Sequence, residues 1–323
     1  MPFHIIIISL IILFLTELFY YKIADHYNIT DKPNHRSSHT QITIRGGGII
    51  FPIAIIFYSV FINFQYPYFI GGLLMISLVS FLDDVKELSS KIRIIIHLVA
   101  VALMFVQVGL FSTTFYWILL GLIFVIGTIN AINFMDGING ITGGYGLITL
   151  VTLYYINFNI IDLADKQLLL ITILSVLVFN FFNFRVKARC FAGDVGSVSL
   201  AFIILFFMLK LILKTENVSY MLLLLIYGLD TMTTIVFRLI RKENIFKAHR
   251  SHFYQFLANE KHLSHLSVAA IYMLFQGIIN LLLITFLLVS VNKSFLLAGF
   301  ITVLFVATRL MMEKPKRLFT VTQ

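Results

Sequence analysis

Aspartates at four points of the chain could supply the carboxylates of a metal or acid–base site. Asp83 and Asp84 are adjacent, Asp136 follows a stretch with two asparagines, and Asp194 lies between glycines. Adjacent carboxylates repel each other, and burying them is costly unless a cation or a hydrogen-bond donor compensates. Like charges held together therefore often mark a functional site. A plain pair of charges at a helix end is the alternative for Asp83 and Asp84.

A polar stripe precedes the third of these carboxylates. Asn130, Asn133 and Asp136 are spaced by three residues, which places them on one face of a helix. They end a very apolar segment, where amides and carboxylates are costly unless they face a polar cavity. Gly137 and Gly140 allow a tight turn and a close approach of a ligand to the backbone. We therefore expect the stripe to line a site rather than only to pack.

The fourth carboxylate suits a hard metal ion. Asp194 lies in the sequence Gly193-Asp-Val-Gly196-Ser197 at the start of an apolar segment. Mg²⁺ prefers oxygen ligands and usually keeps waters or phosphate oxygens in its shell. N–H groups at the start of a helix also favour a phosphate. An ordinary turn and helix cap is the alternative interpretation.

Basic side chains accompany these acidic groups. His249 and His252 flank Arg250, and Arg45 precedes three glycines some distance after Arg36. Arginine offers bidentate hydrogen bonds to a diphosphate, although basic loops also serve only to set membrane topology. Metal, acidic ligands and cationic side chains are together the parts of a phosphoryl-transfer site.

The composition indicates which elements must position these groups. Of 323 residues, 59% are hydrophobic and only 12% are charged, whereas a soluble domain has roughly 25% charged residues. A helix needs roughly 20 apolar residues to cross a bilayer, and barrel strands would alternate with period two. The sequence therefore predicts an all-α, polytopic integral membrane helical bundle of about 11 transmembrane helices, forming a single domain over residues 1–323. The predicted segments lie near 3–21, 46–62, 68–82, 94–110, 116–133, 141–157, 167–184, 198–213, 219–237, 266–290 and 294–312.

The distribution of basic residues predicts the orientation of this bundle. One set of alternate loops carries most of the 24 Lys and Arg residues, and the opposite loops carry Lys166, Lys214 and Lys293. The basic side should be cytoplasmic, with the N-terminus outside and the C-terminus cytoplasmic. We expect a multi-pass protein of the inner (plasma) membrane whose site faces the cytoplasm. Topology also accounts for the net charge of +9 without nucleic acid, and the single Cys190 excludes an internal disulfide.

Taken in order, these motifs resemble those of the polyprenyl-phosphate N-acetylhexosamine-1-phosphate transferases, the glycosyltransferase 4 type. The resemblance runs along most of the chain, and the ordered set is specific although its single members are not. The matching positions are Arg36 with His39, Arg45 with its glycines, Asp83-Asp84, residues 130–137, residues 191–197, Asp230 and residues 249–255.

The resemblance implies a reaction and its participants. A UDP-activated amino sugar donates sugar-1-phosphate to a polyprenyl phosphate, UMP leaves, and Mg²⁺ is required, with Mn²⁺ as an alternative. This is the first membrane step of cell-surface polysaccharide synthesis. The implied partners are both substrates and membrane lipids, with no nucleic acid and with a homodimer as one option for assembly. A polytopic secondary transporter is the alternative, and polar residues at the midplane with an inverted repeat would support it.

The resemblance also implies roles for the residues. Asp194 is expected to be the main Mg²⁺ ligand, together with Asp136. Asp83 is expected to act as the base or positioning group for the lipid phosphate, with Asp84 beside it as a catalytic residue. The remaining expected site residues bind substrate, and they are Asn130, Asn133, Arg36, Arg45, His249, Arg250 and His252.

Two departures from the family pattern bear on residue roles and on the donor. Asn139 stands where a second aspartate is common, so we assign it at most a polar contact. His249-Arg-Ser-His252 stands where the phospho-MurNAc-pentapeptide translocase usually has three histidines. The histidine departure argues against a muramyl-pentapeptide donor, and the pattern is closer to the type that initiates O-antigen or teichoic-acid synthesis, with UDP-GlcNAc or a 6-deoxy amino sugar as donor.

Overall fold

The computed structural model describes residues 2–33, 41–245, 249–287 and 290–320 of the chain. Within these ranges the fold is a bundle of helices with one two-stranded ribbon, β1 (Thr30–Asp31) and β2 (Thr43–Ile44), which pair antiparallel. The helices are α1 (Phe3–His26), α2 (Ile50–Phe61), α3 (Pro67–Val85), α4 (Ser90–Val108), α5 (Phe115–Met135), α6 (Ile141–Asn159), α7 (Lys166–Asn183), α8 (Gly193–Thr215), α9 (Leu225–Ile240), α10 (Phe253–Asn259), α11 (His265–Leu282), α12 (Val291–Glu313) and α13 (Pro315–Phe319). Short 3-10 turns η1 (Gly47–Ile49), η2 (Leu110–Ser112) and η3 (Val218–Leu224) precede α2, α5 and α9, and a π turn, η4 (Leu283–Leu287), follows α11.

The all-α, membrane-spanning class predicted from the sequence is confirmed. Among the described residues, nine helices are long and apolar enough to cross a membrane. All eleven predicted segments coincide with helices, but the segments at 46–62 and 141–157, which form α2 and α6, are not among the nine. The count of about eleven spans therefore stays a prediction, as does the orientation.

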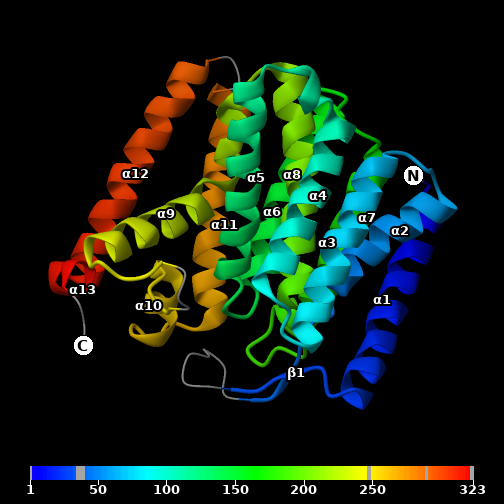
Figure 1. Cartoon of the computed structure of the whole chain (residues 1–323), viewed down its shortest axis with the longest axis horizontal. Coiled ribbons are helices and arrows are strands. Elements are labelled where there is room, and N and C mark those ends of the chain that lie inside the picture. Colours follow the sequence, from blue (N-terminus) through cyan, green and yellow to red (C-terminus); the bar gives the residue numbers. More distant parts are fainter. Residues whose placement is uncertain (1, 34–40, 246–248, 288–289, 321–323) are drawn as a thin grey trace.

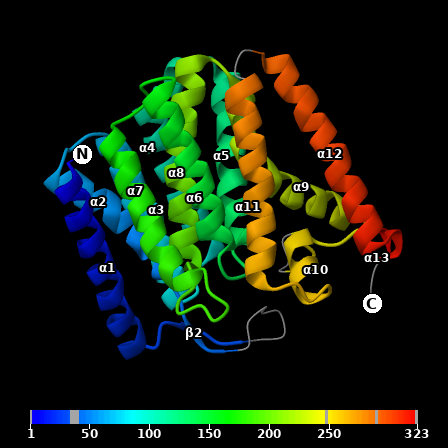
Figure 2. The same cartoon turned by 180° about the vertical axis from the view of Figure 1, so that it is seen from behind.

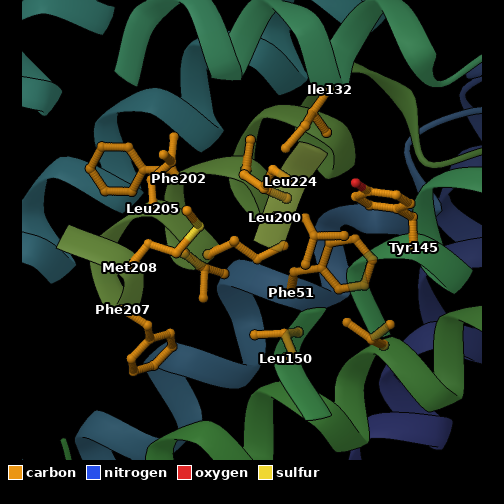
Figure 3. Packing of buried hydrophobic residues seen from close by; sticks show 14 of the residues in the cluster. Phe51, Ile132, Tyr145, Leu150, Leu200, Phe202, Leu205, Phe207, Met208 and Leu224 are labelled. Carbon is orange, nitrogen blue, oxygen red and sulfur yellow. The ribbon is translucent and has the colours of Figure 1, made fainter. Parts of the chain in front are cut away.

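Helix α8 forms the centre of the bundle. In its most apolar stretch 89% of the residues are buried, against 6% in α12. An apolar helix without a polar face belongs inside a core, and α8 packs against α3, α5 and α6. Figure 3 shows Phe202, Leu205 and Met208 of α8 among Phe51 of α2 and Leu150 of α6. The start of α8, with Asp194, is thereby held at the middle of one end of the bundle.

The segments that carry the sequence motifs gather at this same end. The β-ribbon, the connections α3–α4, α5–α6 and α7–α8, and helix α10 all lie at the lower end in Figure 1. The connections α2–α3, α4–α5 and α6–α7 lie at the upper end, and Figure 2 shows the same division from behind. Helix α1 begins at the upper end and α13 lies at the lower end. This arrangement agrees with an odd number of crossings.

Candidate active site

Asp84 lies against the start of helix α8. Its side chain is fully buried, and its two oxygens accept hydrogen bonds from the backbone N–H groups of Asp194 and Val195, each at 2.9 Å. A carboxylate at this position satisfies the unpaired N–H groups of the helix and interacts favourably with its dipole. The expectation that these N–H groups bind a phosphate is therefore wrong for Asp194 and Val195, because Asp84 occupies both.

Two arginines join the carboxylates into one cluster. Arg45 Nε lies 2.7 Å from Asp84, and its Nη2 lies 3.2 Å from Asp194. Arg93 Nη1 lies 2.6 Å from Asp83 and 3.9 Å from the second oxygen of Asp194. Burial by itself lowers the pKa of Arg45, but the carboxylates of Asp84 and Asp194 outweigh this effect, so the pKa is raised. We call Asp83, Asp84, Asp194, Arg45 and Arg93 the ion cluster.

Exposure differs sharply within the ion cluster. The side chains of Asp84 and Asp83 are 0% and 8% exposed, whereas that of Asp194 is 23% exposed. The two guanidinium side chains are about a third exposed, at 34% for Arg45 and 37% for Arg93. Asp84 thus serves mainly to fix the cluster, and the groups that remain accessible from outside are Asp194 and the two arginines.

Glycines permit the close backbone approach that assembles the cluster. A Cβ on Gly48 would lie 2.2 Å from the Cα of Gly196, so η1 crosses the first turn of α8 in direct backbone contact. Gly193 has φ +71° and its Cβ would lie 2.6 Å from Asp84. Only glycine takes this conformation without strain. The glycines after Arg45 and around Asp194 therefore bring two distant stretches of chain together.

Asp136 and Asn133 border the ion cluster from helix α5. The Ser197 hydroxyl donates to Asn133 Oδ1 at 2.6 Å, which ties the end of α5 to the first turn of α8. Removal from water raises the pKa of Asp136 to about 7, and the negative charges of Asp194 and Asp84 add to this rise. Asp136 therefore lies within electrostatic reach of the cluster.

The other two polar residues of this stretch lie elsewhere. The Asn130 side chain is exposed and donates to the Ile126 carbonyl of its own helix at 2.9 Å, so the structure does not bring it to the cluster. Asn139 is buried and donates to the carbonyls of Arg185 and Val186 at 2.9 and 3.1 Å. It thus joins the α5–α6 and α7–α8 connections, consistent with a purely polar contact.

Residues 249–252, which we call the histidine segment, directly precede helix α10. The rings of His249 and His252 stack with centroids 5.0 Å apart, and His252 is only 3% exposed. Burial lowers the pKa of His249 to about 4, and the positive charge of Arg238 acts in the same direction. His249 is therefore neutral at pH 7, and the fixed positive charge of this segment belongs to Arg250.

Two further arginines, which precede the histidine segment, are hydrogen-bonded to other groups of the protein. Arg238 and Arg241 are buried, and both bond to Glu243 at 2.9 and 2.5 Å. Arg241 also donates to the Arg317 carbonyl at 3.1 Å. These side chains shape the loop and do not face a ligand. Arg36 lies outside the described residues.

The donor set of the site fits a magnesium ion that is shared with substrate. No group of three or more His, Cys, Asp or Glu side chains among the described residues could hold a metal alone. Mg²⁺ does not need such a cage, because it is often held by one or two carboxylates plus phosphate oxygens. The ion cluster sets three carboxylates against two guanidiniums, and Asp136 lies close enough to Asp194 for the two carboxylates to interact electrostatically. Both supply the hard oxygens that Mg²⁺ prefers.

Sequence reasoning did not single out Arg93 or Ser197 as site residues. Arg93 lies in the first turn of helix α4, ten positions after Asp83, a spacing typical of no motif, and in the sequence it is simply one of the basic loop residues that indicate topology. Its contacts with Asp83 and Asp194 depend on how α3, α4 and α8 pack. Ser197 was visible in the glycine motif, but its bond to Asn133 joins residues 64 positions apart.

Comparisons with known proteins agree with the resemblance seen in the motifs. A model of glycosyl transferase family 4 matches residues 66–212, which include Asp83, Asp84, Asp136 and Asp194. A probable undecaprenyl-phosphate N-acetylglucosaminyl 1-phosphate transferase of Bacillus subtilis (strain 168) is 28% identical over 289 residues, covering 83% of this chain and 80% of the relative. Both matches support the resemblance of this chain to glycosyl transferase family 4. Arg45 and the histidine segment lie outside the range that the family model matches, yet Arg45 is bonded directly to two residues inside that range.

Proposed function

We propose that the protein transfers an N-acetylated amino sugar-1-phosphate from a UDP-sugar to polyprenyl (undecaprenyl) phosphate and releases UMP. The observation that carries the proposal is the ion cluster, which sits at one end of an apolar bundle beside Asp136 and Asn133. A polyprenyl phosphate has its head at the membrane interface and its tail in lipid, whereas a nucleotide sugar arrives from water. A catalyst that joins them must place its charged groups at that boundary.

The proposed reaction is a direct displacement at phosphorus. An ionised oxygen of the lipid phosphate attacks the β-phosphorus of the UDP-sugar and forms a new P–O–P bond. The bond between the β-phosphorus and the bridging oxygen breaks, and its electrons leave with UMP. Because the attacking phosphate is already ionised near pH 7, no strong base is needed, and Asp83 acts in positioning through Arg93.

Cationic groups must offset the repulsion between two anionic substrates. Arg93 and Arg45 point partly exposed guanidiniums into the site, and each is held by aspartates on the protein side. A guanidinium held in this way needs little reorganisation when charge develops in the transition state. We assign Arg93 to the lipid phosphate, since it lies in the first turn of helix α4 at the end of the bundle that carries the ion cluster. We assign Arg45, His249, Arg250 and His252 to the donor.

We propose that the reaction depends on Mg²⁺ held by Asp194 and Asp136. When bound, such an ion would neutralise charge on the donor diphosphate. Asp194 is exposed enough to share a metal ion with a substrate phosphate. We assign Asn133, which accepts a hydrogen bond from Ser197 in the first turn of α8, to the nucleotide.

The proposed setting is the cytoplasmic face of the inner (plasma) membrane, in the first membrane step of surface-polysaccharide synthesis. The basic loops lie at the end of the bundle that carries the ion cluster, and lysine- and arginine-rich loops face the cytoplasm. The similarity to the Bacillus subtilis N-acetylglucosaminyl 1-phosphate transferase supports N-acetylglucosamine as the sugar. The chain also lacks a three-histidine run at 249–252, which supports a donor other than the muramyl-pentapeptide one.

The secondary-transporter alternative receives no support from the buried charges of the helices. Glu17 and Asp230 lie within apolar helices, as transport residues would. Glu17, however, accepts from Cys190 in the α7–α8 connection, and Asp230 accepts from the start of α10. Both residues therefore hold loops at the site end.

Purified protein tests the proposal with undecaprenyl phosphate, Mg²⁺ and a panel of UDP-amino sugars. We expect UMP release with at least one N-acetylated donor, and none when either the lipid phosphate or Mg²⁺ is left out. No UMP release with any donor would contradict the proposed function.

A further inference from the structure

Helix α12 is almost wholly exposed apolar surface, yet it carries a buried arginine. In its most apolar stretch 6% of the residues are buried, whereas Arg309 is only 1% exposed. A charged side chain within an apolar helix is costly and marks a functional role by default, with a partner to be named. Arg309 therefore needs an explanation beyond lipid contact.

Each nitrogen of the Arg309 guanidinium has a hydrogen-bond partner, and the partners of the two Nη atoms lie outside α12. Nε donates to Glu313 at 2.6 Å, and Nη1 donates to the hydroxyls of Thr233 and Thr234 in α9 at 2.8 and 2.9 Å. Nη2 donates to the backbone carbonyl of Ser251 at 3.0 Å. The guanidinium thus connects α12 and α9 to the segment that carries the histidines.

Asp230 of α9 holds the same turn from its other side. Its carboxylate accepts from the backbone N–H groups of Phe253 and Tyr254 at 2.8 and 3.1 Å, and from the Tyr272 hydroxyl at 2.6 Å. Arg309 Nη1 lies 3.9 Å from the same carboxylate. Residues 251–254 are therefore held from two sides. The Asp230 carboxylate accepts hydrogen bonds from two of their N–H groups, and the Arg309 guanidinium donates to one of their carbonyls.

The turn leads directly to the proposed reaction centre. The Tyr254 hydroxyl donates to the Phe134 carbonyl at 3.1 Å, two positions before Asp136. His252 lies within the turn and stacks on His249. Any shift at Ser251 thus moves both the histidines and the tyrosine that braces the Asp136 stretch.

An arginine that served only topology or helix packing would not require these contacts. A topology-setting arginine lies hydrated at the interface, and packing between α12 and α9 needs no bond to Ser251. We propose that Arg309, together with Asp230, is a positioning residue that fixes residues 249–254 for donor binding, so that the last long helix becomes part of the active site. The part of this inference that concerns the donor rests on the proposed function.

Variants of Arg309 test the inference against a control on the same helix. Arg309→Lys keeps the charge but cannot reproduce the forked contacts, and Arg309→Met removes the charge. Thr308→Val is the matched control, because Thr308 is exposed and its hydroxyl bonds only within α12, to the Leu304 carbonyl. The readouts are amide hydrogen exchange over residues 251–256 and the KM for the UDP-sugar, the KM for the lipid phosphate, and kcat.

We expect faster exchange over residues 251–256 in both Arg309 variants, with exchange in α3 and α8 as in the unmodified protein. Misplaced binding groups typically cost about 10- to 100-fold, and we expect at least a tenfold rise in the KM for the UDP-sugar in Arg309→Lys. The KM for the lipid phosphate should stay within about twofold, and Thr308→Val should change nothing. Exchange that is unchanged in Arg309→Met would overturn the inference. So would an Arg309→Lys protein that changes kcat and both KM values to the same extent.

The exchange measurement needs no turnover. If the unmodified protein released no UMP, the proposed function would fail, while the positioning of residues 251–254 by Arg309 would still be decided by hydrogen exchange.

Discussion

Asp194 is more exposed than Asp83 or Asp84 and contacts both arginines of the ion cluster. This makes it the carboxylate best placed to share a metal ion with a substrate phosphate. Asp84 differs from it in kind, because its oxygens are used by the α8 backbone and by Arg45. Neighbouring residues of the same type therefore have separate roles, which their exposure and hydrogen bonds distinguish.

Asp194→Asn should abolish Mg²⁺-dependent turnover and leave the fold intact. The amide keeps the shape of the side chain but loses the charge that a metal ion requires, and losses on the order of 100-fold or more are typical when an electrostatic group is removed from such a site. The measurement is UMP release, with thermal unfolding as the check on folding. Asp162→Asn, at the opposite end of the bundle, is the control. Normal turnover in Asp194→Asn would show that the metal assignment is wrong.

Arg93→Gln should raise the KM for polyprenyl phosphate by about tenfold or more. A hydrogen bond to a charged group contributes about 1.5–3 kcal/mol, and 1.4 kcal/mol corresponds to tenfold in affinity. Lys91→Gln is the matched control, since Lys91 lies in the same first turn of α4 and is exposed. If both variants changed the KM equally, Arg93 would act only through the general charge of this face.

At the scale of the elements, the crossing of η1 and α8 decides whether the cluster forms. Gly48 and Gly196 meet backbone to backbone, and the strand pairing of Ile44 with Cys190 continues the same contact. The stretch that carries Arg45 is thereby laid against the start of the central helix. The motifs Arg-Gly-Gly-Gly and Gly-Asp-x-Gly-Ser are thus two halves of one contact.

Gly48→Ala should lower both thermal stability and activity. Its Cβ would lie 2.2 Å from the Gly196 Cα, which is backbone and cannot rotate away. Overpacking of this kind typically costs about 1–3 kcal/mol, and the separation should also draw Arg45 away from Asp194. Gly127→Ala in α5 is the control, because nothing lies within 4 Å of its added Cβ. A Gly48→Ala protein with unchanged melting temperature and rate would contradict this account of the crossing.

At this scale the sequence predicts elements better than contacts. Apolar runs of roughly 20 residues report helices directly, and each predicted segment is helical in the structure. The bond from Asp84 to the α8 backbone joins residues 110 positions apart, and Arg309 reaches Thr233 across 76 positions. Such contacts depend on how whole helices pack against each other. A local pattern of residues does not encode this packing. Arg93 and Arg309 were therefore not predicted as site residues, although both were plain in the sequence.

For the whole molecule, the remaining question is which end faces the cytoplasm. The chain offers a direct test, because its single Cys190 is fully buried and burial raises the pKa of its thiol. We therefore expect Cys190 not to react with a maleimide, so that labelling reports only on the engineered cysteine. Thr114 and Lys86 are exposed and follow α4 and α3 at opposite ends of the bundle.

Thr114→Cys should react with a membrane-impermeant maleimide in intact spheroplasts, and Lys86→Cys should react only after permeabilisation. This result follows if the basic loops are cytoplasmic. The unmodified protein is the control for Cys190. The reverse pattern of labelling would place the ion cluster outside the cell, away from any cytosolic nucleotide sugar.

The central claim concerns which bond is broken, and a donor labelled with ³²P at the β-phosphorus tests it most directly. Purified protein would receive this UDP-sugar, undecaprenyl phosphate and Mg²⁺, with the Asp194→Asn protein in parallel. The account predicts that the label enters the lipid fraction together with the sugar, that unlabelled UMP appears in equal amount, and that the variant gives neither. Label that stays with a water-soluble nucleotide while the sugar enters the lipid would contradict it, because only the sugar would then have been transferred.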